Sequence, residues 1–183
     1  MTQVVQDALL APLVAELNAV DGDVRAMQTT LGATELGRAA PHGGWTVGQI
    51  FEHLIVSNTL YFEAMEQAIA GGRAAGASAT WRPSFLGRWL VNSLSPRSTR
   101  RVPAPRIFQP GPEPRANVVE ALLQSHDRYR ALVRTAAGID LARTRVTSPV
   151  SPLIRVNLGD AFRITVVHEQ RHLQQIRRIL EQS

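Results

Sequence analysis

Four long segments of this chain repeat apolar residues at intervals of three and four, and this period constrains the fold more than any other feature. Apolar residues at that spacing form one face of an α-helix. The segments run from Asp7 to Leu31, from Thr46 to Ala70, from Glu113 or Asn117 to Ala137, and from between Asn157 and Asp160 to Glu181. No region of the sequence is rich in strand signals. The chain is therefore predicted to be an all-α four-helix bundle with little or no strand.

Residues at the helix ends support two of these segments. Thr46 and Gln49 have the spacing of a capping box at the start of the second helix, and Gly71 follows its last turn. Asn157 followed by Asp160 is a start signal for the last helix. The capping signals thus predict where the second and fourth helices begin.

The size and composition are those of one globular domain, residues 1–183. The chain has 183 residues, 44% hydrophobic and 19% charged, and no cysteine. The absence of cysteine excludes disulfides, thiolate metal sites and cysteine nucleophiles. No apolar stretch approaches the ~18 residues of a membrane span, and the N-terminal segment lacks the pattern of a signal peptide. A cytoplasmic protein with no membrane partner is the expectation.

The basic charge of the chain does not by itself indicate nucleic acid as a partner. The net charge is +5, and all twenty basic residues are arginines. They are spread along the chain, with one denser patch at Arg97, Arg100, Arg101 and Arg106. Prolines interrupt this patch and it has few aromatic residues for base stacking. A solvated loop is the favoured interpretation, and nucleic acid binding is not expected.

Two long connections separate the helices. The stretch from Gly72 to Pro112 holds six of the eleven prolines and several large apolar residues, so part of it should pack, with a short helix from Ser84 to Ser93. Such a structured connection is a lid or binding wall, or a plain crossover between helices. The stretch from Leu141 to Leu158 is expected to form an extended excursion.

Three histidines are the candidate metal ligands. His168 and His172 are four residues apart on the last helix, so their imidazoles share one face and can bind one ion. The letters H-E-x-x-H match the zinc-protease signature, but the chain offers no usual third ligand downstream, so the third must come from upstream. A helical projection also turns His53 towards the interior. Histidines that merely fill the core are the alternative.

Two segments of the chain resemble one known family. Residues 44–54, GWTVGQIFEHL, resemble the W-[ST]-x-x-[EQ]-x-x-x-H-L signature of the DinB-like superfamily, and the last helix has its histidine pair before L-x-Q-I. The resemblance implies an up-down-down-up bundle and a divalent metal, zinc or nickel, held by the histidines that match His53, His168 and His172. The family includes thiol S-transferases that use bacillithiol or mycothiol and a mycothiol-dependent isomerase, and it implies a low-molecular-weight thiol as a cosubstrate.

Other polar residues near these positions carry weaker expectations. Glu169 is a candidate for a base or for a hydrogen bond to a ligand, but a salt bridge to an arginine is favoured. His126 lies beside Asp127 and Arg128 and is predicted to lie on the surface. His42 is a distant candidate for the mouth of the site.

The sequence leaves three functional hypotheses. The first is a metal-dependent enzyme, either a low-molecular-weight-thiol S-transferase or a hydrolase. The second is a non-catalytic bundle that binds a metal or small ligand in a stress response, and the third is a bundle with core histidines. A homodimer is expected, because the first and third helices carry more apolar residues than one interior face requires.

Overall fold

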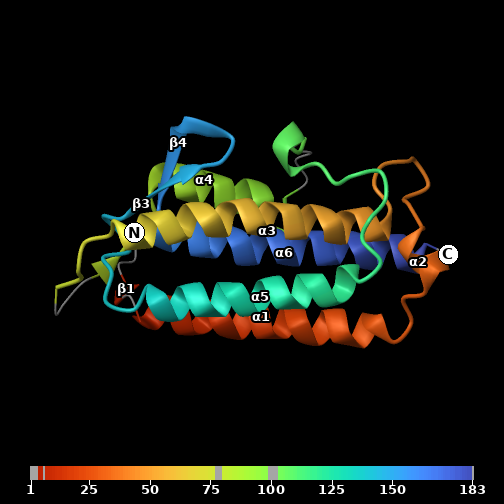
Figure 1. Cartoon of the computed structure of the whole chain (residues 1–183), viewed down its shortest axis with the longest axis horizontal. Coiled ribbons are helices and arrows are strands. Elements are labelled where there is room, and N and C mark those ends of the chain that lie inside the picture. The colour runs from red at the N-terminus through yellow and green to blue at the C-terminus, as the bar shows by residue number, and fades with distance from the viewer. Residues whose placement is uncertain (1–3, 6, 77–79, 99–102, 183) are drawn as a thin grey trace.

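Four long helices lie side by side along the long axis of the molecule (Figure 1). The structure is a computed structural model, and it describes residues 4–5, 7–76, 80–98 and 103–182. The long helices are α1 (Asp7–Gln28), α3 (Val47–Ala70), α5 (Val118–Thr135) and α6 (Leu158–Glu181). In Figure 1, α1 and α6 run in one direction, and α3 and α5 run in the other. The predicted four-helix bundle and its up-down-down-up connectivity are confirmed.

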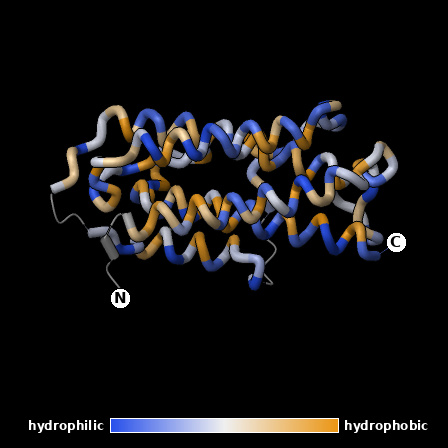
Figure 2. The backbone as a smooth tube through the Cα atoms, turned by 90° about the horizontal axis from the view of Figure 1, so that it is seen from below, coloured by the Kyte–Doolittle hydropathy of each residue, from blue (hydrophilic) through white to orange (hydrophobic). Residues whose placement is uncertain are grey.

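The four helices close around one hydrophobic core. Helix α3 packs against α5 and α6, and α1 packs against the same two helices from the other side. Figure 2 shows that hydrophobic and hydrophilic stretches alternate along the helices, as expected when each helix turns one face inward. The largest fully buried side chains come from every helix of the bundle and include Leu17, Phe51, Phe62, Tyr129 and Phe162.

The helix starts follow the signals in the sequence. The Oγ1 atom of Thr46 accepts a hydrogen bond from the backbone N–H of Gln49 (3.2 Å), and the Gln49 side chain accepts one from the N–H of Thr46 (3.0 Å). At the start of α6, the side chain of Asn157 accepts a hydrogen bond from the N–H of Asp160 at 2.7 Å. These caps satisfy donors that the first helical turn leaves free.

The 72–112 connection returns the chain along the bundle, because α3 and α5 point in the same direction and follow one another in sequence. It contains the short helix α4 (Phe85–Leu94), which confirms the helix expected there, and the 3₁₀ turn η1 (Arg106–Phe108). Helix α4 packs against α6. The connection is thus a crossover that also covers one flank of the bundle (Figure 1).

Short strands occupy one end of the bundle. Strands β3 (Arg145–Ser148) and β4 (Ser151–Asn157) form an antiparallel hairpin, and β1 (Val4–Val5) pairs with β2 (Thr80–Trp81). A one-turn helix α2 (Ala33–Leu36) lies between α1 and α3. The hairpin is the extended excursion expected between Leu141 and Leu158.

None of the described helices has the length and hydropathy that a bilayer span needs.

Candidate metal centre

The three predicted histidines meet between α3 and α6. The Nε2 atom of His168 lies 3.3 Å from Nε2 of His53 and 3.1 Å from Nε2 of His172. His53 is 3% exposed, whereas His168 and His172 are partly buried. The ligand atoms of the three residues all lie within 4.8 Å of one another. The structure therefore brings together residues that are more than a hundred positions apart in the sequence.

Hydrogen bonds at Nδ1 determine which nitrogen of two of these rings faces the cluster. The Nδ1–H of His53 donates to the backbone carbonyl of Phe108 at 2.7 Å. The Nδ1–H of His172 donates to the side-chain oxygen of Gln175 at 2.9 Å. Because both acceptors take a proton from Nδ1, the Nε2 atoms of both neutral rings carry lone pairs. Two unprotonated nitrogens thus point at the same place as Nε2 of His168.

The surroundings keep all three imidazoles neutral. Burial lowers the pKa of His53 below its ordinary value, although the Phe108 carbonyl and the charge of Glu169 act in the opposite direction. Burial and the two neighbouring histidines lower the pKa of His168 well below its ordinary value. Burial and His53 lower the pKa of His172 to about 3. Neutral imidazole is the form that binds metals.

The spacing of the three Nε2 atoms fits a shared divalent ion. Two ligands of a tetrahedral zinc at ~2.0–2.1 Å are about 3.4 Å apart, and adjacent ligands of an octahedral ion are about 3.0 Å apart. The two Nε2 separations to His168, 3.1 and 3.3 Å, span these values. Hydrogen bonding satisfies the cluster less well, because a proton on Nε2 of His168 can be donated to only one of the two facing lone pairs at full strength. The donor set therefore fits a metal better than a core of hydrogen-bonded histidines.

The 72–112 connection forms a wall beside the cluster. Phe108, which receives the His53 hydrogen bond, stacks on Tyr61 of α3 with ring centroids 5.6 Å apart. The guanidinium of Arg171, between the two α6 histidines, donates to the carbonyls of Ser93, Ser95 and Ser98 at 3.1–3.3 Å. The connection is therefore attached to both helices that carry the histidines.

Two predictions about neighbouring residues are wrong. His126 is not on the surface: it is 0% exposed and lies inside the bundle, against Asp21 and Glu169. Glu169 is also 0% exposed, and its partners are His126 and the Asn58 amide rather than an arginine. The sequence did not reveal this arrangement, because the charged residues beside His126 made its helix face look exposed.

Other sequence candidates lie apart from the cluster. His42 is exposed and does not belong to the three-histidine group. In the arginine patch, Arg97 and Arg106 are exposed, whereas Arg100 and Arg101 lie outside the described residues. The patch therefore stays without an assigned role.

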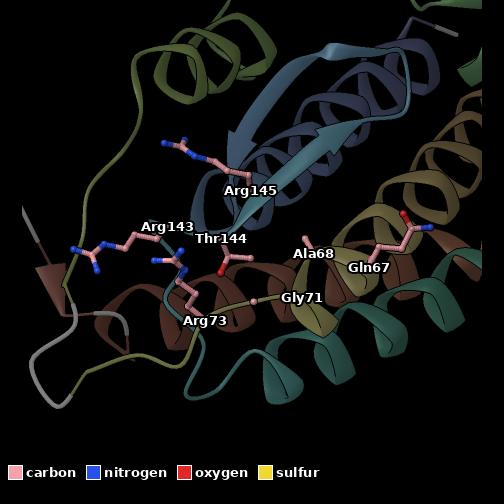
Figure 3. A pocket seen from close by; sticks show the side chains of 8 residues that line it. Gln67, Ala68, Gly71, Arg73, Arg143, Thr144 and Arg145 are labelled. Atoms are coloured by element: carbon pink, nitrogen blue, oxygen red, sulfur yellow. The ribbon is translucent and has the colours of Figure 1, made fainter.

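A separate hollow of about 360 Å³ lies at the C-terminal end of α3. Figure 3 shows its eight lining residues, among them Arg73, Arg143 and Arg145. It begins at Gln67, roughly 20 Å along α3 from His53 at about 1.5 Å per residue. None of the three clustered histidines lines it. The hollow is therefore separate from the histidine cluster.

Comparisons with known proteins agree with this architecture. A family model described as the DinB superfamily matches residues 16–176. No curated protein matches the chain. The solved structure of YfiT from Bacillus subtilis, described as a probable metal-dependent hydrolase with an unusual four-helix bundle topology, matches with a TM-score of 0.60 and 19% identity. That match covers 94% of this chain and 86% of YfiT.

Proposed function

Because this chain belongs to the DinB superfamily, we propose that it binds one divalent metal ion, zinc or nickel, through His53, His168 and His172. The observation that carries the proposal is the convergence of three neutral imidazoles, two of them with Nε2 lone pairs directed by hydrogen bonds at Nδ1. Three histidine ligands leave at least one coordination position open, which is the pattern of a catalytic site rather than a structural one.

We further propose that the open position serves a metal-dependent hydrolase or a low-molecular-weight-thiol S-transferase. A divalent ion at this position would lower the pKa of a bound water to about 7, or would bind an external thiol as thiolate. The chain has no cysteine, so any thiol must come from a second substrate. His168 and His172 are partly exposed, which supports the access of a small molecule to the open position.

A non-catalytic metal-binding or ligand-binding role is the second candidate, and the position of Glu169 favours it. In a zinc protease the glutamate of H-E-x-x-H acts on the metal-bound water. Here one Glu169 oxygen accepts a hydrogen bond from Asn58 at 2.8 Å and lies 3.4 Å from Nε2 of His126. Glu169 is 0% exposed and one of its oxygens is engaged inside the bundle, so we infer that a hydrolytic reaction would use another base.

Elemental analysis followed by a ligand screen tests the proposal. Purified protein should contain or take up one equivalent of zinc or nickel. The unfolding temperature of the metal-loaded protein should then rise when a small thiol or a hydrolysis product is added, because a ligand that binds only the folded state stabilises it. A metal-loaded protein that neither responds to these ligands nor turns over any substrate would favour the non-catalytic role. Protein that takes up no metal would contradict both.

A further inference from the structure

A second cluster of titratable side chains lies inside the bundle, beside the histidines. Nδ1 of His126 on α5 lies 2.5 Å from a carboxylate oxygen of Asp21 on α1. Nε2 of the same ring lies 3.4 Å from Oε1 of Glu169 on α6. His126 and Glu169 are both 0% exposed. We call Asp21, His126 and Glu169 the buried triad.

The buried triad is linked to all four long helices. Asn58 on α3 donates one hydrogen bond to Glu169 at 2.8 Å and another to Ser125 on α5 at 2.9 Å. At the outer end, Arg130 forms an ion pair with Asp21. Burial alone would lower the pKa of His126, but the facing carboxylates of Glu169 and Asp21 outweigh it and raise the pKa to about 9. The imidazolium therefore carries a charge that balances the carboxylates of Glu169 and Asp21.

Stability alone does not explain such a network. Replacing a buried ion pair by well-packed apolar residues is often neutral or stabilising, whereas removing one partner is strongly destabilising. The second oxygen of Glu169 accepts no hydrogen bond from any described residue, and Nε2 of His126 donates none, so the 3.4 Å contact between His126 and Glu169 is an ion pair rather than a hydrogen bond. A partly satisfied buried network of this kind favours a role in specifying one arrangement of the helices.

The position of Glu169 indicates which arrangement is specified. It directly follows His168 and precedes His172 by three residues on α6. At about 100° per residue, the three side chains have fixed relative directions around the helix axis. When Glu169 points at His126, the two α6 histidines must therefore face His53 on α3. A rotation of α6 that released Glu169 would also turn both histidines away.

We propose that the buried triad sets the rotation of α6 and thereby aims His168 and His172 at His53. Asp21, His126 and Glu169 are positioning residues of the metal centre, and they touch neither the ion nor a substrate. The proposal rests on the metal-binding function proposed above. A purely structural network is the competing interpretation, and it would affect stability without affecting the geometry or affinity of the metal site.

Metal affinity and metal spectroscopy distinguish the two interpretations. Glu169→Gln and His126→Gln each remove one charge of the triad and keep the approximate size of the side chain. The Kd for Zn²⁺, measured by competition with a chelator, should rise about 10- to 100-fold in each variant, as is typical when a supporting partner of a metal ligand is lost. The absorption bands of the Co²⁺-loaded protein should also shift. The double variant should lose less than the product of the two effects, because both changes remove the same interaction.

Tyr129→Phe is the matched control. The Tyr129 hydroxyl donates to the Phe162 carbonyl at 3.2 Å, so this variant removes one buried hydrogen bond between the same two helices, α5 and α6, without touching the triad. It should lower the unfolding temperature and leave the Zn²⁺ Kd within about twofold. Asp21→Asn, near the surface, replaces Glu169→Gln or His126→Gln if either fails to fold, and should also weaken Zn²⁺ binding.

The outcomes separate this inference from the proposed function. Folded triad variants with the wild-type Kd and Co²⁺ spectrum would overturn it, as would a Tyr129→Phe variant that weakens Zn²⁺ binding equally. Wild-type protein that binds no metal would instead refute the metal assignment. The ring ¹⁵N shifts of His168 and His172 in the metal-free protein would then decide: a change in Glu169→Gln but not in Tyr129→Phe supports the positioning role, and no change in either overturns it.

Discussion

The orientation of two of the three imidazoles in the cluster is determined by the group that accepts the Nδ1 proton. His53 uses the backbone carbonyl of Phe108, and His172 uses the side chain of Gln175 three residues later on the same helix. The i, i+4 spacing of His168 and His172 was visible in the sequence, and so was the inward face of His53. The Phe108 carbonyl was not, because a backbone acceptor 55 residues away leaves no residue-type signal.

Gln175 gives the most accessible test at the residue scale. Gln175→Leu removes the acceptor that holds the Nδ1 proton of His172, so its Nε2 lone pair is no longer directed at the site. The Kd for Zn²⁺ should rise by about tenfold or more, measured by chelator competition. Gln174→Leu is the control, because no hydrogen bond links Gln174 to a clustered histidine among the described residues. Equal affinities in the two variants would show that the Gln175 contact has no role.

At the scale of elements, hydrogen bonds join the 72–112 connection to the start of α6. The indole N–H of Trp81 donates to the side chain of Asn157 at 2.9 Å. The backbone N–H of Ser84 donates to the carboxylate of Asp160 at 3.0 Å. Capping signals predicted where α3 and α6 begin, since a cap is local. These contacts were not predictable, because they join residues about 75 positions apart and leave no local sequence pattern.

Two helical glycines should respond oppositely to alanine. A Cβ on Gly159 in α6 would lie 2.2–2.7 Å from the buried Trp81 indole, so Gly159→Ala must displace that ring. Gly22 in α1 has no atom within 4 Å of its Cβ position. Gly159→Ala should lower the free energy of unfolding by about 1–3 kcal/mol, and Gly22→Ala should raise it by up to about 1 kcal/mol. Urea denaturation measures both, and a stabilised Gly159→Ala would contradict the close contact between Gly159 and the Trp81 indole.

At the scale of the whole molecule, the bundle buries histidines of opposite character. His126 was predicted at the surface because Asp127 and Arg128 flank it, yet α5 turns it inward to Asp21 and Glu169. A single sequence shows the direction of each helix face only approximately, and it does not show which buried groups meet. The overall bundle was predictable from periodicity, whereas this internal ion network depends on the packing of three helices.

The stability of the metal-free protein should therefore peak near pH 6.5. The pKa of His172 is lowered to about 3 in the folded protein, whereas it is ~6.5 in the unfolded chain. Between these two pH values the unfolded chain binds more protons than the folded protein, so stability falls as the pH drops below ~6.5. The pKa of His126 is raised to about 9, so its contribution is complete below ~6.5 and is lost as the pH rises towards 9. Each limb has a slope of at most about 1.4 kcal/mol per pH unit per group. Denaturant unfolding from pH 5 to 9 should show the fall in stability on both sides of the maximum, and His126→Gln should lack the fall on the alkaline side. An alkaline fall of unchanged slope in that variant would show that His126 does not cause it.

We also expect a homodimer, although not for the reason found in the sequence. The exposed large hydrophobic residues among those described lie on α4, η1 and the β3–β4 hairpin, not on the first and third long helices. Phe85 is 81% and Trp89 is 48% exposed, one turn apart on α4. Light scattering should give about twice the 20.1 kDa chain mass, and Phe85→Ser with Trp89→Ser should lower it. A wild-type mass of one chain at micromolar concentration would contradict the dimer.

Metal stoichiometry tests the central claim most directly. Wild-type protein, stripped with a chelator and dialysed against Zn²⁺ or Ni²⁺, should retain one equivalent per chain by elemental analysis. His53→Ala, His168→Ala and His172→Ala should each abolish stoichiometric binding, because two imidazoles hold an ion far more weakly than three. His42→Ala, which changes an exposed histidine outside the cluster, should still retain one equivalent. Wild-type protein without metal, or a His168→Ala variant that keeps a full equivalent, would contradict the three-histidine centre.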